Sequence, residues 1–174
     1  PALKHYELFA RFFRPDWPAL IALLKLGIPI GLTLLAEVGM FNGAAILMGW
    51  QGVIPLAAHG IVLQIAALSF LLPFGLSQAG TVRVGQAVGR ADILGVERAA
   101  KTSLVLGLGL GLTTAVMFWI FPAPIISLFL DKSNEDAALI LAYGIPLLGI
   151  AAAFQVFDST QVTSVALLRG IKDA

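Results

Sequence analysis

The sequence has 174 residues, of which 59% are hydrophobic and 12% are charged, with a mean hydropathy of +0.93 and a net charge of +1. A soluble domain carries about 25% charged residues, so this chain has too little polar material to cover a water-facing surface. The absence of cysteine excludes disulfides, thiolate nucleophiles and Cys-ligated metal sites. The composition therefore predicts an all-α fold, a polytopic transmembrane helix bundle.

Residues 1–24 combine basic and aromatic side chains, among them Arg11, Arg14 and Trp17. Aromatic rings favour the headgroup level of a membrane and bases face anionic lipid, so we expect a cytoplasmic or interfacial linker. A connecting segment that merely tolerates this composition is the alternative.

Four apolar segments follow, and a helix needs about 20 such residues to cross the hydrocarbon core of a bilayer. We predict spanning helices over approximately 27–49, 56–82, 102–121 and 137–168. The polar segment 83–101 lacks a long apolar run and predicts a loop that carries a short surface helix.

The third apolar segment contains Gly107, Gly109 and Gly111, an alternation that also occurs in strands. A lone strand cannot satisfy its backbone in lipid, so we predict a helix. Gly107 and Gly111 have the small-xxx-small spacing that lets a neighbouring helix pack closely. Pro122 and Pro124 should end this helix.

Basic residues predict the orientation of the helices. Ten of the eleven Lys and Arg residues lie in the two chain ends and in segment 83–101, and only Lys132 lies in the alternate loops. Because Lys and Arg favour cytoplasmic loops, both ends and the loop 83–101 should be cytoplasmic. The loops 50–55 and 122–134 should face outward.

Two acidic residues, Glu37 and Asp158, lie inside apolar segments. Glu37 is 12 residues from Lys25 and Asp158 is 11 residues from Arg169, which places both roughly 16–18 Å from the same membrane face. Acids near the middle of a bilayer are costly and usually functional, so we expect a site for H⁺ or Na⁺. A structural acid bonded to its surroundings is the alternative.

Polar residues near these acids are candidates for the lining of a cavity. They are Thr33, Gln64, Gln78, Gln155 and Gln161. Gln155, Asp158 and Gln161 follow one another at three-residue spacing, which places them on one side of a helix. Most Ser and Thr hydroxyls here should instead bond to their own helix.

Other chemistry is poorly supported. The two histidines, His5 and His59, are far apart in the chain, so we expect no metal site beyond Na⁺ at Glu37 and Asp158. The sequence contains no phosphate-binding loop for ATP, no H-E-x-x-H and no G-x-S-x-G. We therefore expect no enzyme and no cofactor, with Na⁺ as a candidate coupling ion.

Three stretches, in order, resemble the multidrug and toxic compound extrusion (MATE) family, in its NorM-like bacterial branch. They are KLGIPIGLTLLAEVGMF (25–41), PLAAHGIVLQIAALSFLLPFGLSQAGTVRVGQAVG (55–89) and FQVFDSTQVTSVALLRGIKDA (154–174). The resemblance implies a twelve-helix, two-lobe transporter, with residues 25–174 forming part of its C-terminal lobe. The N-terminal lobe and the last two helices would then be partners from the same protein.

The resemblance also implies a function, which is export of cationic amphiphilic drugs in exchange for Na⁺ or H⁺ by a multi-pass protein of the bacterial inner membrane. Glu37 and Asp158 match the family's two coupling-ion acids. Relatives more often have Gln at the position of Gly60, and some have a Tyr at Phe154 that ligates the ion, so Phe154 favours H⁺. Expected partners are the lipid bilayer and small cationic organic substrates, and no nucleic acid.

Two other functions remain open from the sequence. One is a flippase for lipid-linked oligosaccharides in the same fold group, although such proteins usually have basic residues in the cavity and none lies within a predicted span here. The other is a membrane scaffold subunit that transports nothing.

Overall fold

A computed structural model describes residues 17–131 and 135–171. The chain forms two compact units, Pro1–Phe41 and Asn42–Ala174. Helix α1 (Trp17–Gln51) begins in the first unit, and its last residues, from Asn42 onward, belong to the second. Most of the predicted linker, residues 1–16, lies outside the described residues, whereas residues 17–24 are helical.

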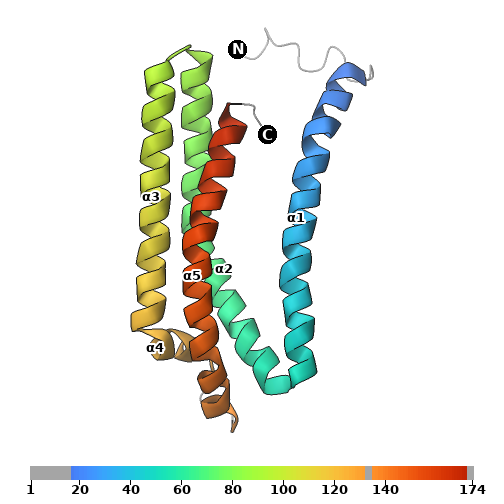
Figure 1. Cartoon of the computed structure of the whole chain (residues 1–174), viewed down its shortest axis with the longest axis vertical. Coiled ribbons are helices and arrows are strands. Elements are labelled where there is room, and N and C mark those ends of the chain that lie inside the picture. The colour runs from blue at the N-terminus through green and yellow to red at the C-terminus, as the bar shows by residue number, and fades with distance from the viewer. Residues whose placement is uncertain (1–16, 132–134, 172–174) are drawn as a thin grey trace, which may run out of the picture. The chain divides into compact units, whose positions relative to one another are not determined.

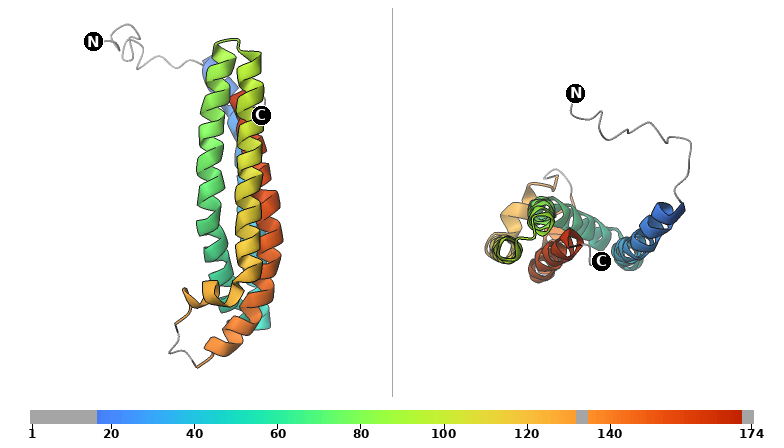
Figure 2. Two further views of the ribbon diagram at one scale, coloured as in Figure 1. Left: turned by 90° about the vertical axis from the view of Figure 1, so that its left-hand side faces the viewer. Right: turned by 90° about the horizontal axis from the view of Figure 1, so that it is seen from above.

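Four further helices belong to the second unit: α2 (Val53–Gly89), α3 (Ile93–Ile120), α4 (Pro122–Ser127) and α5 (Ala137–Gly170). Helices α2, α3 and α5 lie side by side, and the short α4 packs against α5 beyond the end of α3 (Figures 1 and 2). In the described part of the chain, α1, α2, α3 and α5 are long and apolar enough to cross a membrane. The prediction of an all-α bundle with four spanning helices is confirmed.

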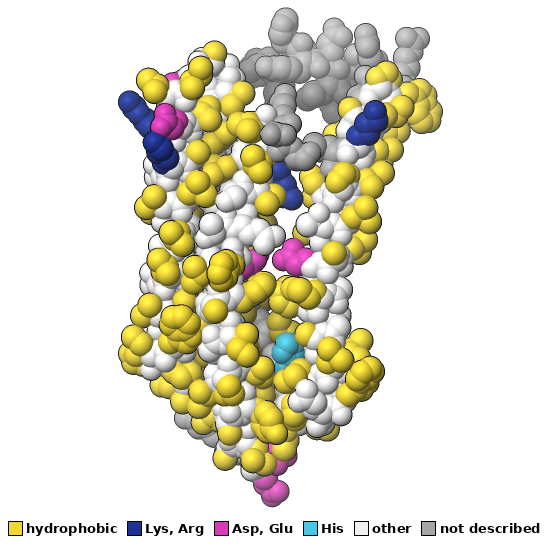
Figure 3. Space-filling view, viewed as in Figure 1, with side chains coloured by type: hydrophobic (Ala, Val, Ile, Leu, Met, Phe, Trp, Pro, Cys, Tyr) yellow, Lys and Arg dark blue, Asp and Glu magenta, His cyan; other side chains and the backbone are white. Residues whose placement is uncertain are grey.

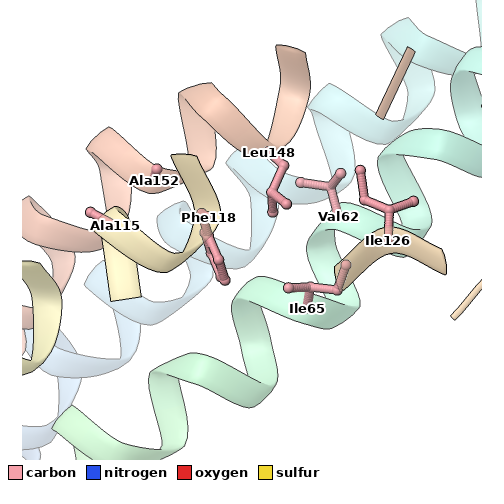
Figure 4. Close-up of a cluster of buried hydrophobic side chains, with 7 residues drawn as sticks. All are labelled: Val62, Ile65, Ala115, Phe118, Ile126, Leu148 and Ala152. Carbon is pink, nitrogen blue, oxygen red and sulfur yellow. The ribbon is translucent and has the colours of Figure 1, made fainter. Parts of the chain in front are cut away.

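The core of the second unit lies where the three long helices meet near α4. It consists of Val62 and Ile65 from α2, Ala115 and Phe118 from α3, Ile126 from α4, and Leu148 and Ala152 from α5 (Figure 4). Ile126, Leu148 and Ala152 are fully buried. Burial of a large aliphatic side chain contributes about 1.5–3 kcal/mol, so this cluster fixes the positions of the helix ends next to α4.

Hydrogen bonds join α5 to both α2 and α3. Thr81 Oγ1 on α2 donates to Ala166 O at 2.8 Å, and Trp119 Nε1 on α3 donates to Gly149 O at 3.0 Å. The two bonds lie toward opposite ends of α5, so they fix its position at two separate points.

The prediction that residues 83–101 form a loop that carries a short surface helix is wrong in its extent, because most of the segment belongs to the two long helices. Helix α2 continues to Gly89 and α3 begins at Ile93, so only three residues separate them. Ala91 turns the chain with a φ of 54°, and Asp92 caps α3 by accepting a hydrogen bond from Gly95 N at 2.8 Å. The polar composition of this segment marks the end of the apolar runs of α2 and α3, and a helix need not end where its apolar run ends.

Pro122 ends α3 as predicted, because α3 stops at Ile120. The two prolines also begin the short helix α4, which the sequence analysis did not predict. Proline fits the first turn of a helix because its missing N–H has no partner to lose there.

Candidate functional site

The buried face of α5 carries polar side chains packed against α3. Gln155, Ser159 and Thr163 are each at most 1% exposed. Gly111 lies against Ser159, and a Cβ added to Gly107 would lie 3.3 Å from Thr163 Cβ. The prediction that Gly107 and Gly111 allow close helix packing is confirmed, and α5 is the neighbouring helix.

The hydroxyl groups of α5 are bonded within their own helix. Ser159 Oγ and Thr160 Oγ1 donate to Val156 O at 3.1 and 2.8 Å, and Thr163 Oγ1 donates to Ser159 O at 2.8 Å. This agrees with the sequence-based prediction for most of these residues. Amide and carboxylate groups are therefore the polar atoms of this helix that are best placed to bind a ligand.

Asp158 lies beside the buried face of α5 and is half-buried. The two amides predicted to accompany it differ in burial, because Gln155 is 1% exposed and Gln161 is exposed. Among the described residues, Gln155 Nε2 is buried without a hydrogen-bond partner. Asp158 thus marks the border between the α3–α5 contact and the open surface of α5.

The first unit carries the other candidate acid. Glu37 lies on α1 one helical turn after Thr33, so the two residues share a face. Thr33 Oγ1 donates to Pro29 O of its own helix at 2.9 Å. In residues 28–41 of α1, Glu37 is the only ionisable side chain.

The other cavity candidates lie on α2. Gln64 and Gln78 are exposed within the second unit. His59, on the same helix, has its Nε2 atom buried without a hydrogen-bond partner among the described residues. Within residues 17–131 and 135–171, no three His, Asp or Glu side chains form a group that could hold a metal ion.

The MatE family model matches residues 29–174. The chain belongs to the MatE family. The four long apolar helices described above agree with this assignment, and they make the chain part of a multi-pass membrane protein. The family predicted from the three sequence stretches is confirmed.

Curated relatives of this MatE chain cover almost its whole length. It is 50% identical over 173 residues to the probable multidrug resistance protein NorM of Rhizobium meliloti (strain 1021), which covers 99% of this chain and 37% of the relative. The proteins of the same name from Agrobacterium fabrum and Pseudomonas aeruginosa are 48% and 40% identical, with 37% and 36% of the relative covered. The MatE chain thus spans little more than a third of the length of these relatives.

Proposed function

We propose that the full-length protein containing this chain is a secondary antiporter that exports cationic amphiphilic compounds in exchange for H⁺ or Na⁺. Glu37 and Asp158 would share the coupling-ion site, and the two lobes would expose it to one side of the membrane at a time. The relatives named multidrug resistance proteins support the class of function. They point to a transporter rather than an enzyme.

The observation that carries the proposal is the position of Asp158. It lies in the middle of a spanning helix, 11 residues before Arg169, and borders a face that is fully packed. Glu37 lies 12 residues after Lys25 on α1, so residue counting along each helix predicts a similar depth of roughly 16–18 Å for the two carboxylates. Ionised acids at such a depth are expensive, which favours a role in binding a cation.

Ion binding at such a site can drive transport because it neutralises the negative charge of the carboxylates. A carboxylate in a water-poor cavity is stabilised by a proton or Na⁺, and the conformation that binds the ion more tightly becomes more populated. A cationic substrate would bind to the same ionised carboxylates. Ion and substrate therefore compete, and each is released in the state that favours the other.

The proposal includes the position in the membrane. The distribution of the basic residues supports a position of both chain ends and the α2–α3 turn on the cytoplasmic side of the bacterial inner membrane. An N-terminal lobe and two further helices would complete the cavity, since alternating access needs two halves around one site. Phe154, one turn before Asp158, provides no oxygen to ligate Na⁺ and so favours H⁺.

The test is transport by the full-length protein in proteoliposomes under separate H⁺ and Na⁺ gradients, with a fluorescent cationic dye as substrate. Glu37→Gln, Asp158→Asn and the double variant should each abolish coupled export. Glu97→Gln is the matched control, because Glu97 is exposed and pairs with Lys101 outside the apolar segments. Undiminished coupled export by the double variant would refute the shared site.

Two outcomes would favour the other functions. Ion-independent movement of lipid-linked oligosaccharides across the membrane, without dye export, would indicate a flippase. No binding of dye, H⁺ or Na⁺ by the full-length protein would indicate a scaffold subunit.

A further inference from the structure

A groove of about 530 Å³ lies between α2 and α3 in the second unit, on the side of the α2–α3 turn. Three arginines line it: Arg83 and Arg90 from α2, and Arg98 from α3. Leu76 and Leu106 line the groove farther from the turn. We refer to this feature as the α2–α3 groove.

The short turn brings the three arginines together. Arg83 and Arg90 are seven residues apart, which places them on one face of α2 with about 10 Å between their positions along the axis. Arg98 lies less than two turns into α3, which runs back along α2 after the three-residue turn. Figure 3 shows Lys and Arg side chains over this end of α3, together with an acidic side chain and next to hydrophobic side chains.

The nearby acids are engaged elsewhere. Asp92 accepts the capping hydrogen bond from Gly95 N, and Glu97 forms an ion pair with Lys101 on the same helix. In residues 17–131 and 135–171, no carboxylate forms an ion pair with the three groove arginines. Among the described residues, the groove therefore presents three guanidinium groups that form no ion pair with a carboxylate.

The chemistry of this lining matches a phosphate ester. Each guanidinium offers a planar fork of donors that binds phosphate oxygens in pairs. Thr102 and Ser103 add hydroxyl groups to the lining, and Ser103 is 7% exposed. The same charges would repel a cation, so the lining favours an anionic ligand.

The position of the groove favours a lipid headgroup over a free anion as the source of the phosphate. Its arginines lie where α2 and α3 leave their apolar segments, and Leu76 and Leu106 continue the lining into the spanning region. A ligand that fits both parts has an anionic head and an apolar tail. Basic pockets between transmembrane helices bind anionic phospholipid headgroups in this way.

We propose that the α2–α3 groove is a binding site for an anionic glycerophospholipid. Arg83, Arg90 and Arg98 hold its phosphate, and an acyl chain lies along Leu76 and Leu106. The bound lipid would neutralise the three charges and join α2 to α3 near the membrane surface. This proposal depends only on the membrane location, so it stands or falls separately from the antiport proposal.

The test is native mass spectrometry of the delipidated full-length protein, titrated with dioleoyl phosphatidylglycerol, dioleoyl phosphatidylcholine or inorganic phosphate. Phosphatidylglycerol should bind well above the other two. Arg83→Gln with Arg98→Gln should weaken its binding by about thirtyfold, at about 1 kcal/mol for each base. Arg169→Gln is the matched control, because Arg169 lies at the same end of the bundle but does not line the groove.

Equal binding of phosphatidylglycerol and phosphatidylcholine, or equal losses in the double variant and the control, would overturn the proposal. Equal binding of inorganic phosphate would also overturn it, because it would indicate a soluble anion as ligand. If the double variant does not fold, a photoreactive phosphatidylglycerol analogue tests the wild-type protein. Crosslinks should then fall within residues 76–106, and crosslinks elsewhere would refute the site.

Discussion

Gly111 on α3 lies so close to Ser159 on α5 that the two helices leave no room for a side chain between them. A Cβ on Gly111 would lie 3.2 Å from both Ser159 Cβ and Gln155 O, and nearer still to Ser159 Oγ. Transmembrane helices gain stability from such close backbone approach, since lipid provides no hydrophobic drive for them to associate. The contact also fixes the part of α5 that carries Asp158.

Substitution of Gly111 by Ala should destabilise the protein. The added methyl group meets backbone as well as the Ser159 side chain, so α3 and α5 must separate, at a cost of about 1–3 kcal/mol. Thermal unfolding of the purified full-length protein in detergent measures the effect.

Gly109→Ala is the matched control for this substitution. Nothing lies within 4 Å of a Cβ at Gly109, and alanine favours a helix over glycine by about 1 kcal/mol. The control should be neutral or stabilising. Equal melting temperatures for Gly111→Ala and the wild type would show that α3 and α5 are not in tight contact there.

Substitution of Thr81 by Val should weaken the attachment of α5 to α2. It removes the hydroxyl that donates to Ala166 O at 2.8 Å and also lies 3.1 Å from Ser77 O of its own helix, while it keeps the shape of the side chain, at a cost of about 1 kcal/mol. Thr113→Val is the control, because Thr113 donates only to Gly109 O of its own helix. A larger loss of melting temperature in the control than in Thr81→Val would contradict the assigned role.

Sequence patterns predicted the centres of the helices better than their ends. Apolar runs report the thickness of lipid that a helix crosses, so segments 56–82 and 102–121 were placed correctly. They do not report where the backbone stops being helical, and α2 and α3 extend through most of 83–101. The signal that could have found the turn is Asp92, an N-cap residue followed by apolar helix formers.

For the candidate site as well, the sequence predicts some residues and misses others. Glu37 and Asp158 stand out in the sequence because each is an acid in an apolar run. The groove arginines contribute only to the predicted orientation, because their convergence depends on a turn of three residues, whereas the sequence predicts a loop with a short surface helix over residues 83–101. Burial of Gln155 against α3 was also missed, since spacing alone does not show which side of a helix faces a neighbour.

Removal of the Asp92 cap should reduce the local stability of the α2–α3 turn. Asp92→Ala removes the acceptor for Gly95 N and should destabilise the α2–α3 turn by about 1 kcal/mol. Asp92→Ser retains a capping oxygen and is expected to stay near the wild type. Hydrogen exchange of the amides in residues 93–96 measures the opening of this turn, and unchanged exchange in Asp92→Ala would argue against the cap.

Replacement of the buried Gln155 amide by an apolar side chain should change stability and transport in opposite directions. A buried donor without a partner costs about 1–3 kcal/mol, so the apolar and similarly shaped Gln155→Met should raise the melting temperature. If the amide lines the path proposed for the cation, dye export should fall in the same variant. Gln161→Met, at an exposed position of the same helix, should leave the melting temperature unchanged. A lower melting temperature in Gln155→Met would instead show that the amide is hydrogen-bonded in the full-length protein, and its role would then be structural.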